Sequence, residues 1–75
     1  MLLQLESGDW IDLREITGVK ALDGHTSDLT GHYYPPRTQI IIGTNDYRIV
    51  EFNKIEGARL YRDDIARLAN EARRR

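Results

Sequence analysis

The first third of the chain alternates apolar and polar residues with a period that predicts short strands. In MLLQLESGDWIDL, Leu3 and Leu5 alternate with polar residues, and residues 7–9 have the composition of a turn. Trp10 and Ile11 then begin a returning stretch. We interpret this segment as a β-hairpin, because strands of period two around a short polar turn fold back on each other.

A short helical turn and a further strand are expected next. Asp12 precedes Glu15 by three positions, a spacing that resembles a capping box and suits a single helical turn. The segment TGVKAL that follows places Val19 and Ala21 on one face of an extended chain. We therefore expect a strand that ends before the polar residues 23–36.

The clearest pattern is RTQIIIGTNDYRIVEF, which predicts two strands joined by a tight turn at residues 43–46. Ile40 and Ile42 would face one side of the sheet and Ile41 the other. Apolar residues on both faces indicate a sheet that is covered on both sides, by a helix and by a second subunit. Ile41 and Trp10 are accordingly our candidates for a subunit interface.

The last 23 residues, NKIEGARLYRDDIARLANEARRR, predict an amphipathic helix. Asn53 would be its N-cap and Glu56 would complete a capping box, while Gly57 would weaken the first turn. Residues 73–75, all arginine, complement the helix dipole. The apolar stripe recurs at three- and four-residue spacing and consists of Ala58, Tyr61, Ile65, Leu68, Ala69 and Ala72.

These elements define an α+β fold, with about four antiparallel strands and one C-terminal amphipathic helix packed on the sheet. Residues 1–75 form a single domain. A chain of this size buries only about 60% of its unfolded surface, so its stability is marginal without help. The sequence has no cysteine for a disulfide, and two histidines seven residues apart do not make a zinc site. We therefore expect homo-oligomerisation to provide the additional stabilisation.

Composition and charge restrict the environment and the partners. No apolar run approaches the roughly 20 residues that span a bilayer, and the N-terminus does not resemble a signal peptide, so we expect a cytoplasmic protein. The net charge is −1, with −4 on residues 1–36 and +3 on residues 37–75. This basic excess is too small to indicate a nucleic-acid partner by itself.

The order of segments resembles that of known small proteins. WIDLREITGVKAL, a loop, TQIIIGTNDYRIVEF and a helix of the KIEGARLYRDDIARLANEA type are similar to small phage and bacterial proteins of the pleckstrin-homology-like or FlbD-like kind. The sequence differs from the FlbD pattern in its 14-residue loop and its longer helix. The resemblance implies a binding module rather than an enzyme.

Residues 23–36 predict a long loop without regular structure, and such loops are usually functional or disordered. The stretch GHYYPPR, residues 31–37 at the end of this loop, brings together His32, Tyr33, Tyr34 and Arg37, which are our candidate binding residues. Tyrosine and arginine are enriched in binding hot spots, and the proline pair would hold the chain extended. The alternative is that one tyrosine caps the core and the rest is solvated.

Catalytic and metal sites are not expected. His25 and His32 have no serine, cysteine or glutamate at a diagnostic spacing. Asp63 and Asp64 diverge by about 100° on a helix and have arginines at salt-bridge spacing, so they belong to a solvated face. We expect no enzyme activity, no cofactor and no metal.

The sequence thus predicts a small non-catalytic binding protein, a phage-type or bacterial accessory factor. It would occlude or recruit a host protein or complex through the 25–37 loop. One alternative is a protein that binds or sequesters a small nucleotide, stacked by Tyr33 and Tyr34 with its phosphate held by Arg37. A second alternative is nucleic-acid binding through the basic C-terminal half.

Overall fold

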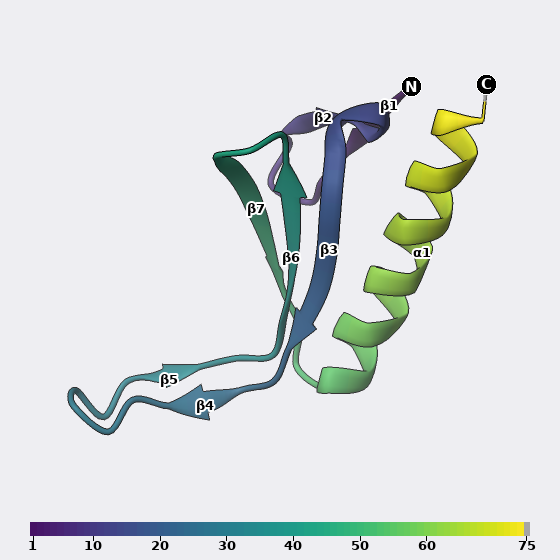
Figure 1. The fold of residues 1–75 in the computed structure, drawn as a ribbon. Coiled ribbons are helices and arrows are strands. Elements are labelled where there is room, and N and C mark those ends of the chain that lie inside the picture. The colour runs from purple at the N-terminus through teal and green to yellow at the C-terminus, as the bar shows by residue number, and fades with distance from the viewer. Residues whose placement is uncertain (75) are drawn as a thin grey trace.

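The computed structural model describes residues 1–74 and confirms the predicted α+β fold. Seven strands, one 3-10 turn and one helix are present within these residues, and the helix packs on a sheet (Figure 1). In chain order they are β1 (Leu2–Gln4), β2 (Trp10–Asp12), η1 (Leu13–Glu15), β3 (Ile16–Leu22), β4 (His25–Thr26), β5 (Tyr33–Tyr34), β6 (Arg37–Ile42), β7 (Asp46–Glu51) and α1 (Ile55–Arg73).

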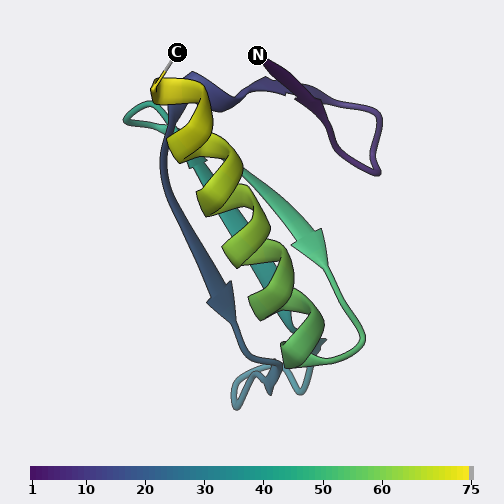
Figure 2. The ribbon, with the colours of Figure 1, turned by 90° about the vertical axis from the view of Figure 1, so that its right-hand side faces the viewer.

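The body of the protein is an antiparallel sheet of order β3-β6-β7, with α1 across one face (Figure 2). Ile40 of the central strand and Ile65 of the helix are both completely buried between the two layers. Thr38 is buried beside them, and its hydroxyl donates to the carbonyl oxygen of Ala58 over 2.7 Å. The core therefore lies between β6 and α1 and is tied across by one buried hydrogen bond.

The opposite face of the sheet is not covered by any helix or strand among residues 1–74. Ile41 is only half-buried, and Tyr47 and Ile49 of the neighbouring strand are exposed. The predicted alternation of Ile40 and Ile41 is thus confirmed, and the helix is the cover of one face. The side chains Ile41, Tyr47 and Ile49 form the apolar part of what we call the open face.

The N-terminal hairpin and the helical turn are formed as the sequence predicts, and both pack on the core. Leu5, Ile11 and Leu13 are buried in the same core cluster as the helix stripe. The carboxylate of Asp12 accepts a hydrogen bond of 3.0 Å from the backbone N–H of Arg14 and so caps the turn. This backbone hydrogen bond lowers the pKa of Asp12 below its ordinary value of 3.8.

The beginning of the helix differs from the prediction. The N-cap is Lys54, which makes no side-chain capping bond, so the expected capping box of Asn53 and Glu56 is wrong. The cause is the sheet: the N–H of Phe52 still donates to the carbonyl of Pro36, just before β6, and this keeps the chain extended up to the expected cap. Phe52 then packs on Gly57, where an added Cβ would lie 3.1 Å from its ring.

The end of the helix is held by an arginine. The guanidinium of Arg73 donates to the backbone carbonyl of Ile16 at the start of β3. The predicted stripe is also confirmed, because Ala58, Ile65, Ala69 and Ala72 are buried and Tyr61 and Leu68 partly so. Of the terminal arginines, Arg75 lies outside the described residues.

The expected loop at residues 23–36 is wrong in its structure, because it contains the strands β4 and β5. These strands project from the sheet on the side away from the helix (Figure 1). The Cα radius of gyration is 13.3 Å, whereas a compact chain of this length has about 11 Å. We call residues 23–36 the arm.

Candidate functional site

The arm continues the β3–β6 hairpin in the same register. The last pair of the sheet joins Leu22 and Arg37, and the arm then pairs His25 with Tyr34 and Thr26 with Tyr33. Between these pairs the ladder is interrupted at residues 23–24 and 35–36. Proline has no N–H to donate, so Pro35, whose backbone faces the other strand, accounts for a missing ladder bond at this point.

The bend at the base of the arm is packed against the body. Pro36 is buried, and its carbonyl oxygen accepts the N–H of Phe52 over 2.8 Å. On the facing strand, a Cβ at Gly24 would lie 2.7 Å from the hydroxyl of Tyr33 and 3.1 Å from Cδ of Pro36. The side chain of Tyr33 therefore lies over Gly24, in space that only glycine leaves free.

The other face of the arm carries three rings in contact. The rings of His25 and Tyr34 are stacked, with centroids 5.1 Å apart and planes at 22°. The ring of His32 meets Tyr34 edge-on, with centroids 4.6 Å apart and planes at 74°. His25, His32 and Tyr34 share one face because residues two apart on a strand point the same way, while Tyr33 points to the opposite face. We call these three side chains the ring face.

The tip of the arm is an ordered turn that presents a leucine. The N–H of Ser27 donates to the carbonyl of His32, and the N–H of Gly31 donates to the carbonyl of Ser27, both over 2.8 Å. Gly31 has a φ of 73°, a left-handed conformation that glycine adopts without strain. Leu29 is 97% exposed at this turn. Sequence reasoning missed it, although a single leucine among the polar residues of SDLTG was the available signal.

The structure brings together some of the predicted binding residues and separates others. His32, Tyr33 and Tyr34 lie on the arm, but the two tyrosines occupy opposite faces. Arg37 belongs to β6, where its guanidinium donates to the carbonyl of Pro35 over 3.4 Å. A single flat ligand stacked between Tyr33 and Tyr34 does not fit this arrangement, so the geometry gives no support to the nucleotide alternative.

The two predicted interface residues lie apart from the arm. Trp10 belongs to the N-terminal hairpin and is 59% exposed. Ile41 belongs to the centre of the open face, on a different sheet from Trp10. They do not form one continuous site with the ring face.

The arm and the body carry no evident metal or membrane-spanning site among residues 1–74. Within residues 1–74, no three or more His, Asp or Glu side chains are grouped so that they could hold a metal ion. The helix that the structure describes is not apolar enough to cross a membrane. The features that stand out for recognition are therefore the ring face and the exposed tip of the arm.

Comparisons with protein-family models, curated proteins and solved structures found no match to this chain. The resemblance to pleckstrin-homology-like and FlbD-like proteins thus stays a prediction from the sequence.

Proposed function

We propose that this chain is a non-catalytic binding protein whose arm docks on another protein. In this proposal it is a cytoplasmic accessory factor of phage or bacterial type, and it occludes or recruits a host protein or complex. The observation that carries the proposal is the arm itself: a bent, projecting ribbon with three rings in contact on one face and Leu29 exposed at its tip.

The arm has features that folding alone does not require. Leu29, Tyr33 and Tyr34 are exposed at 97%, 57% and 42%, so they contribute little to the core. The turn at the tip and the packed bend at Gly24 hold these side chains in place before any partner arrives. Preorganised contact residues lose less conformational entropy on binding, which favours affinity.

Self-association is part of the proposal. The accessible surface of the chain is 5364 Å², whereas a compact monomer of its mass exposes about 4,700 Å². The excess of roughly 600 Å² approaches the roughly 800 Å² that each partner buries in a standard interface. The open face around Ile41 and the exposed Trp10 remain the surfaces that we propose for a second subunit.

The test is to recover partners with the tagged wild-type chain from a bacterial lysate and then to compare variants. Leu29→Asp and Tyr34→Ala should weaken the recovered interaction by about 1 to 4 kcal/mol, the range of hot-spot residues. Their melting temperatures should stay close to that of the wild type, because neither side chain is in the core.

The matched control is Leu60→Ala, which removes an exposed apolar side chain from the helix instead of the arm. It should bind the partner as the wild type does. If the two arm variants bind normally while folded, the arm is not the docking surface. If they unfold at much lower temperature, the arm belongs to the stabilising structure.

A further inference from the structure

A groove runs between the outer edge of β3 and the side of α1. Its cleft has a volume of about 140 Å³ and is lined by residues 16–19 of β3 and by Ala66, Ala69, Asn70 and Arg73 of α1. An engineered apolar cavity of about 150 Å³ accepts benzene, so this cleft has room for one aliphatic side chain. Figure 2 shows β3 at the border of the sheet, beside the helix.

The direction of the backbone groups in β6 follows from one hydrogen bond. The N–H of Phe52 donates to the carbonyl of Pro36, so Pro36 faces the β7 side of its strand. Backbone groups of successive residues in an antiparallel strand alternate in direction. Thr38 and Ile40 therefore also face β7, whereas Gln39 and Ile41 face β3.

The outer edge of β3 is consequently unpaired. Gln39 and Ile41 pair with Lys20 and Gly18, so the N–H and C=O groups of Val19 and Ala21 point away from the sheet. No strand or side chain among residues 1–74 makes a hydrogen bond with these four groups. An unpaired edge of this kind is a template for an added strand.

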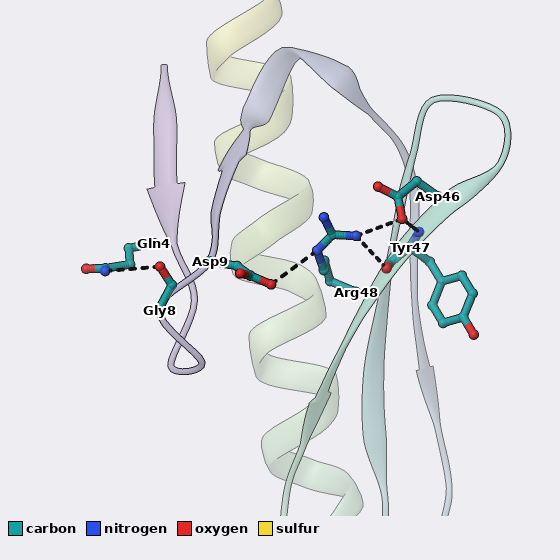
Figure 3. A network of polar contacts seen from close by, with 6 residues as sticks. All are labelled: Gln4, Gly8, Asp9, Asp46, Tyr47 and Arg48. Atoms are coloured by element: carbon teal, nitrogen blue, oxygen red, sulfur yellow. Dashed lines mark hydrogen bonds and ion pairs between the residues drawn. The ribbon is translucent and has the colours of Figure 1, made fainter.

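The opposite edge of the sheet is covered at Tyr47. At Tyr47 of β7, the outward N–H donates to the carboxylate of Asp46 over 2.8 Å, and the outward C=O accepts the guanidinium of Arg48 over 3.0 Å. Arg48 is held in turn by Asp9 of the N-terminal hairpin (Figure 3). Val19 and Ala21 on the edge of β3 have no such cover among residues 1–74, so a strand can add there without displacing a side chain.

One end of the groove carries a cation. Arg73 uses part of its guanidinium to donate to the outward carbonyl of Ile16, and this bond closes the edge of β3 to further pairing there. A guanidinium has five N–H donors, so most remain for a ligand. A chain that ends at this point would place its terminal carboxylate beside Arg73, which suits charge-assisted hydrogen bonding.

We propose that this groove binds the C-terminal end of an extended peptide. The peptide adds to β3 as an antiparallel strand, pairing with the backbone of Val19 and Ala21. Its last side chain, an aliphatic one, fills the cleft beside Ala66, and its carboxylate meets Arg73 at the Ile16 end. Backbone pairing supplies affinity here, and the cleft and the cation select the terminal residue.

This site is separate from the arm, so it stands or fails independently of the proposed function. The test uses the full chain labelled with ¹⁵N and, as the probe, the pentapeptide Lys-Thr-Thr-Thr-Val with a free carboxyl end. The amide signals of Val19 and Ala21 should shift on titration, and their hydrogen exchange should slow. The same peptide with an amidated end should bind about tenfold more weakly, as expected for a lost charge-assisted contact.

Two variants probe the two halves of the site. Ala66→Leu fills the cleft and should weaken peptide binding at least about tenfold while the chain stays folded. Arg73→Gln should make the free and the amidated peptides bind equally. Arg59→Gln is the matched control, because it removes an exposed arginine near the other end of the helix, and it should preserve the difference between the peptides.

Absence of shifts at β3 with the free peptide at millimolar concentration would overturn the proposal. Shifts confined to the arm would overturn it as well. If Arg73→Gln kept the preference for the free carboxyl end, the assignment of the carboxylate to Arg73 would be wrong.

Discussion

His25 and Tyr34 stand directly opposite each other on the two strands of the arm, with their rings stacked 5.1 Å apart. The N–H of Ser27 closes the ladder two residues further on, where it bonds to His32. Aromatic cross-strand pairs contribute roughly 0.2–1 kcal/mol to a two-stranded ribbon. In a ribbon with four paired residues, this pair is a large part of what keeps the arm ordered.

His25→Ala should therefore loosen the arm without unfolding the body. We expect the amide of Ser27 to exchange up to about fivefold faster, the equivalent of 1 kcal/mol. The melting temperature should hardly change, because the arm contributes nothing to the core cluster. The measurement is hydrogen exchange by NMR, with Thr26→Ala as the control, since Thr26 lies on the other face of the same strand. Equal effects of the two changes would contradict a role for the ring stack.

The helix stripe predicts a graded series of stabilities. Ile65 is 1% exposed, so Ile65→Ala should lower the free energy of unfolding by about 2–5 kcal/mol, a large fraction of the stability of a small domain. Leu68 is only partly buried, and Leu68→Ala should cost less. Asp64 lies on the solvated face with Arg67 at 3.6 Å, so Asp64→Ala should change stability by about 0.5 kcal/mol or less. Urea denaturation followed by circular dichroism measures the free energy of unfolding of all three variants. If the losses did not rank Ile65→Ala, Leu68→Ala, Asp64→Ala, the assignment of the buried helix face would be wrong.

The strands and the helix were predictable because their apolar residues repeat with the period of the element. Ile40 and Ile65 follow such repeats, and both are buried as expected. The arm was not predictable in this way, because its strands are two residues each and carry exposed side chains. The pairing of β4 with β5 continues the register of β3 and β6, and that register depends on contacts between segments that are distant in the sequence.

Other features depended on contacts that local sequence does not reveal. The helix begins after Lys54 because sheet pairing continues through Phe52, so the local capping signal at Asn53 was overridden. Arg73 reaches Ile16, 57 residues earlier in the chain. Sequence reasoning marked this segment as a binding loop with His32, Tyr33 and Tyr34, but it did not include His25 or show which rings share a face.

A buried hydrogen bond and an exposed one of equal length allow a matched comparison. The hydroxyl of Thr38 donates to Ala58 and that of Thr17 donates to Gly43, each over 2.7 Å, but only Thr38 is buried. Thr38→Val preserves shape and removes the bond, so it should lower the free energy of unfolding by about 0.5–1.5 kcal/mol. Thr17→Val should cost less, because water can replace its partner. Chemical denaturation of both variants measures the difference, and a larger loss for Thr17→Val would contradict it.

The decrease in the stability of the fold at low pH should depend on two aspartates. The pKa of Asp12 is lowered by the backbone hydrogen bond from Arg14, and that of Asp46 by the side-chain hydrogen bond from Arg48, both from an ordinary value of 3.8. A carboxyl group whose pKa is lower in the folded than in the unfolded state stabilises the fold at pH values above its unfolded-state pKa. This stability is lost as the pH falls through its folded-state pKa. Melting temperatures should therefore drop below about pH 4.

The drop should be shallower in Asp12→Asn, because that side chain no longer takes up a proton. Thermal melts between about pH 2 and 6 test this, since that interval brackets the carboxyl titration. Glu51→Gln is the control, because no ion pair or side-chain hydrogen bond is formed by Glu51 within residues 1–74. If the melting temperatures of Asp12→Asn and the wild type fell equally with decreasing pH, Asp12 would not contribute to the loss of stability in acid.

Arg48 should protect the chain against pairing through β7. Its guanidinium bonds to Asp46 over 2.7 Å and covers the outward carbonyl of Tyr47, and Asp9 holds it from the hairpin (Figure 3). Charged side chains on edge strands commonly prevent such pairing. Arg48→Ala leaves an edge with the exposed Tyr47 and Ile49 beside it, so it should raise self-association above that of the wild type.

Light scattering after gel filtration, over a series of micromolar concentrations, measures this change directly. Arg62→Ala is the matched control. Arg62 forms a similar ion pair with Asp63 at 3.0 Å, but this pair lies on the helix instead of an edge strand. It removes the same charge from the protein, so an effect of net charge on solubility would appear in both variants. Association that rises in Arg48→Ala alone assigns the protection to the covered edge, because only that variant uncovers the carbonyl of Tyr47. Equal masses for both variants and the wild type at every concentration would show that the edge of β7 needs no such cover.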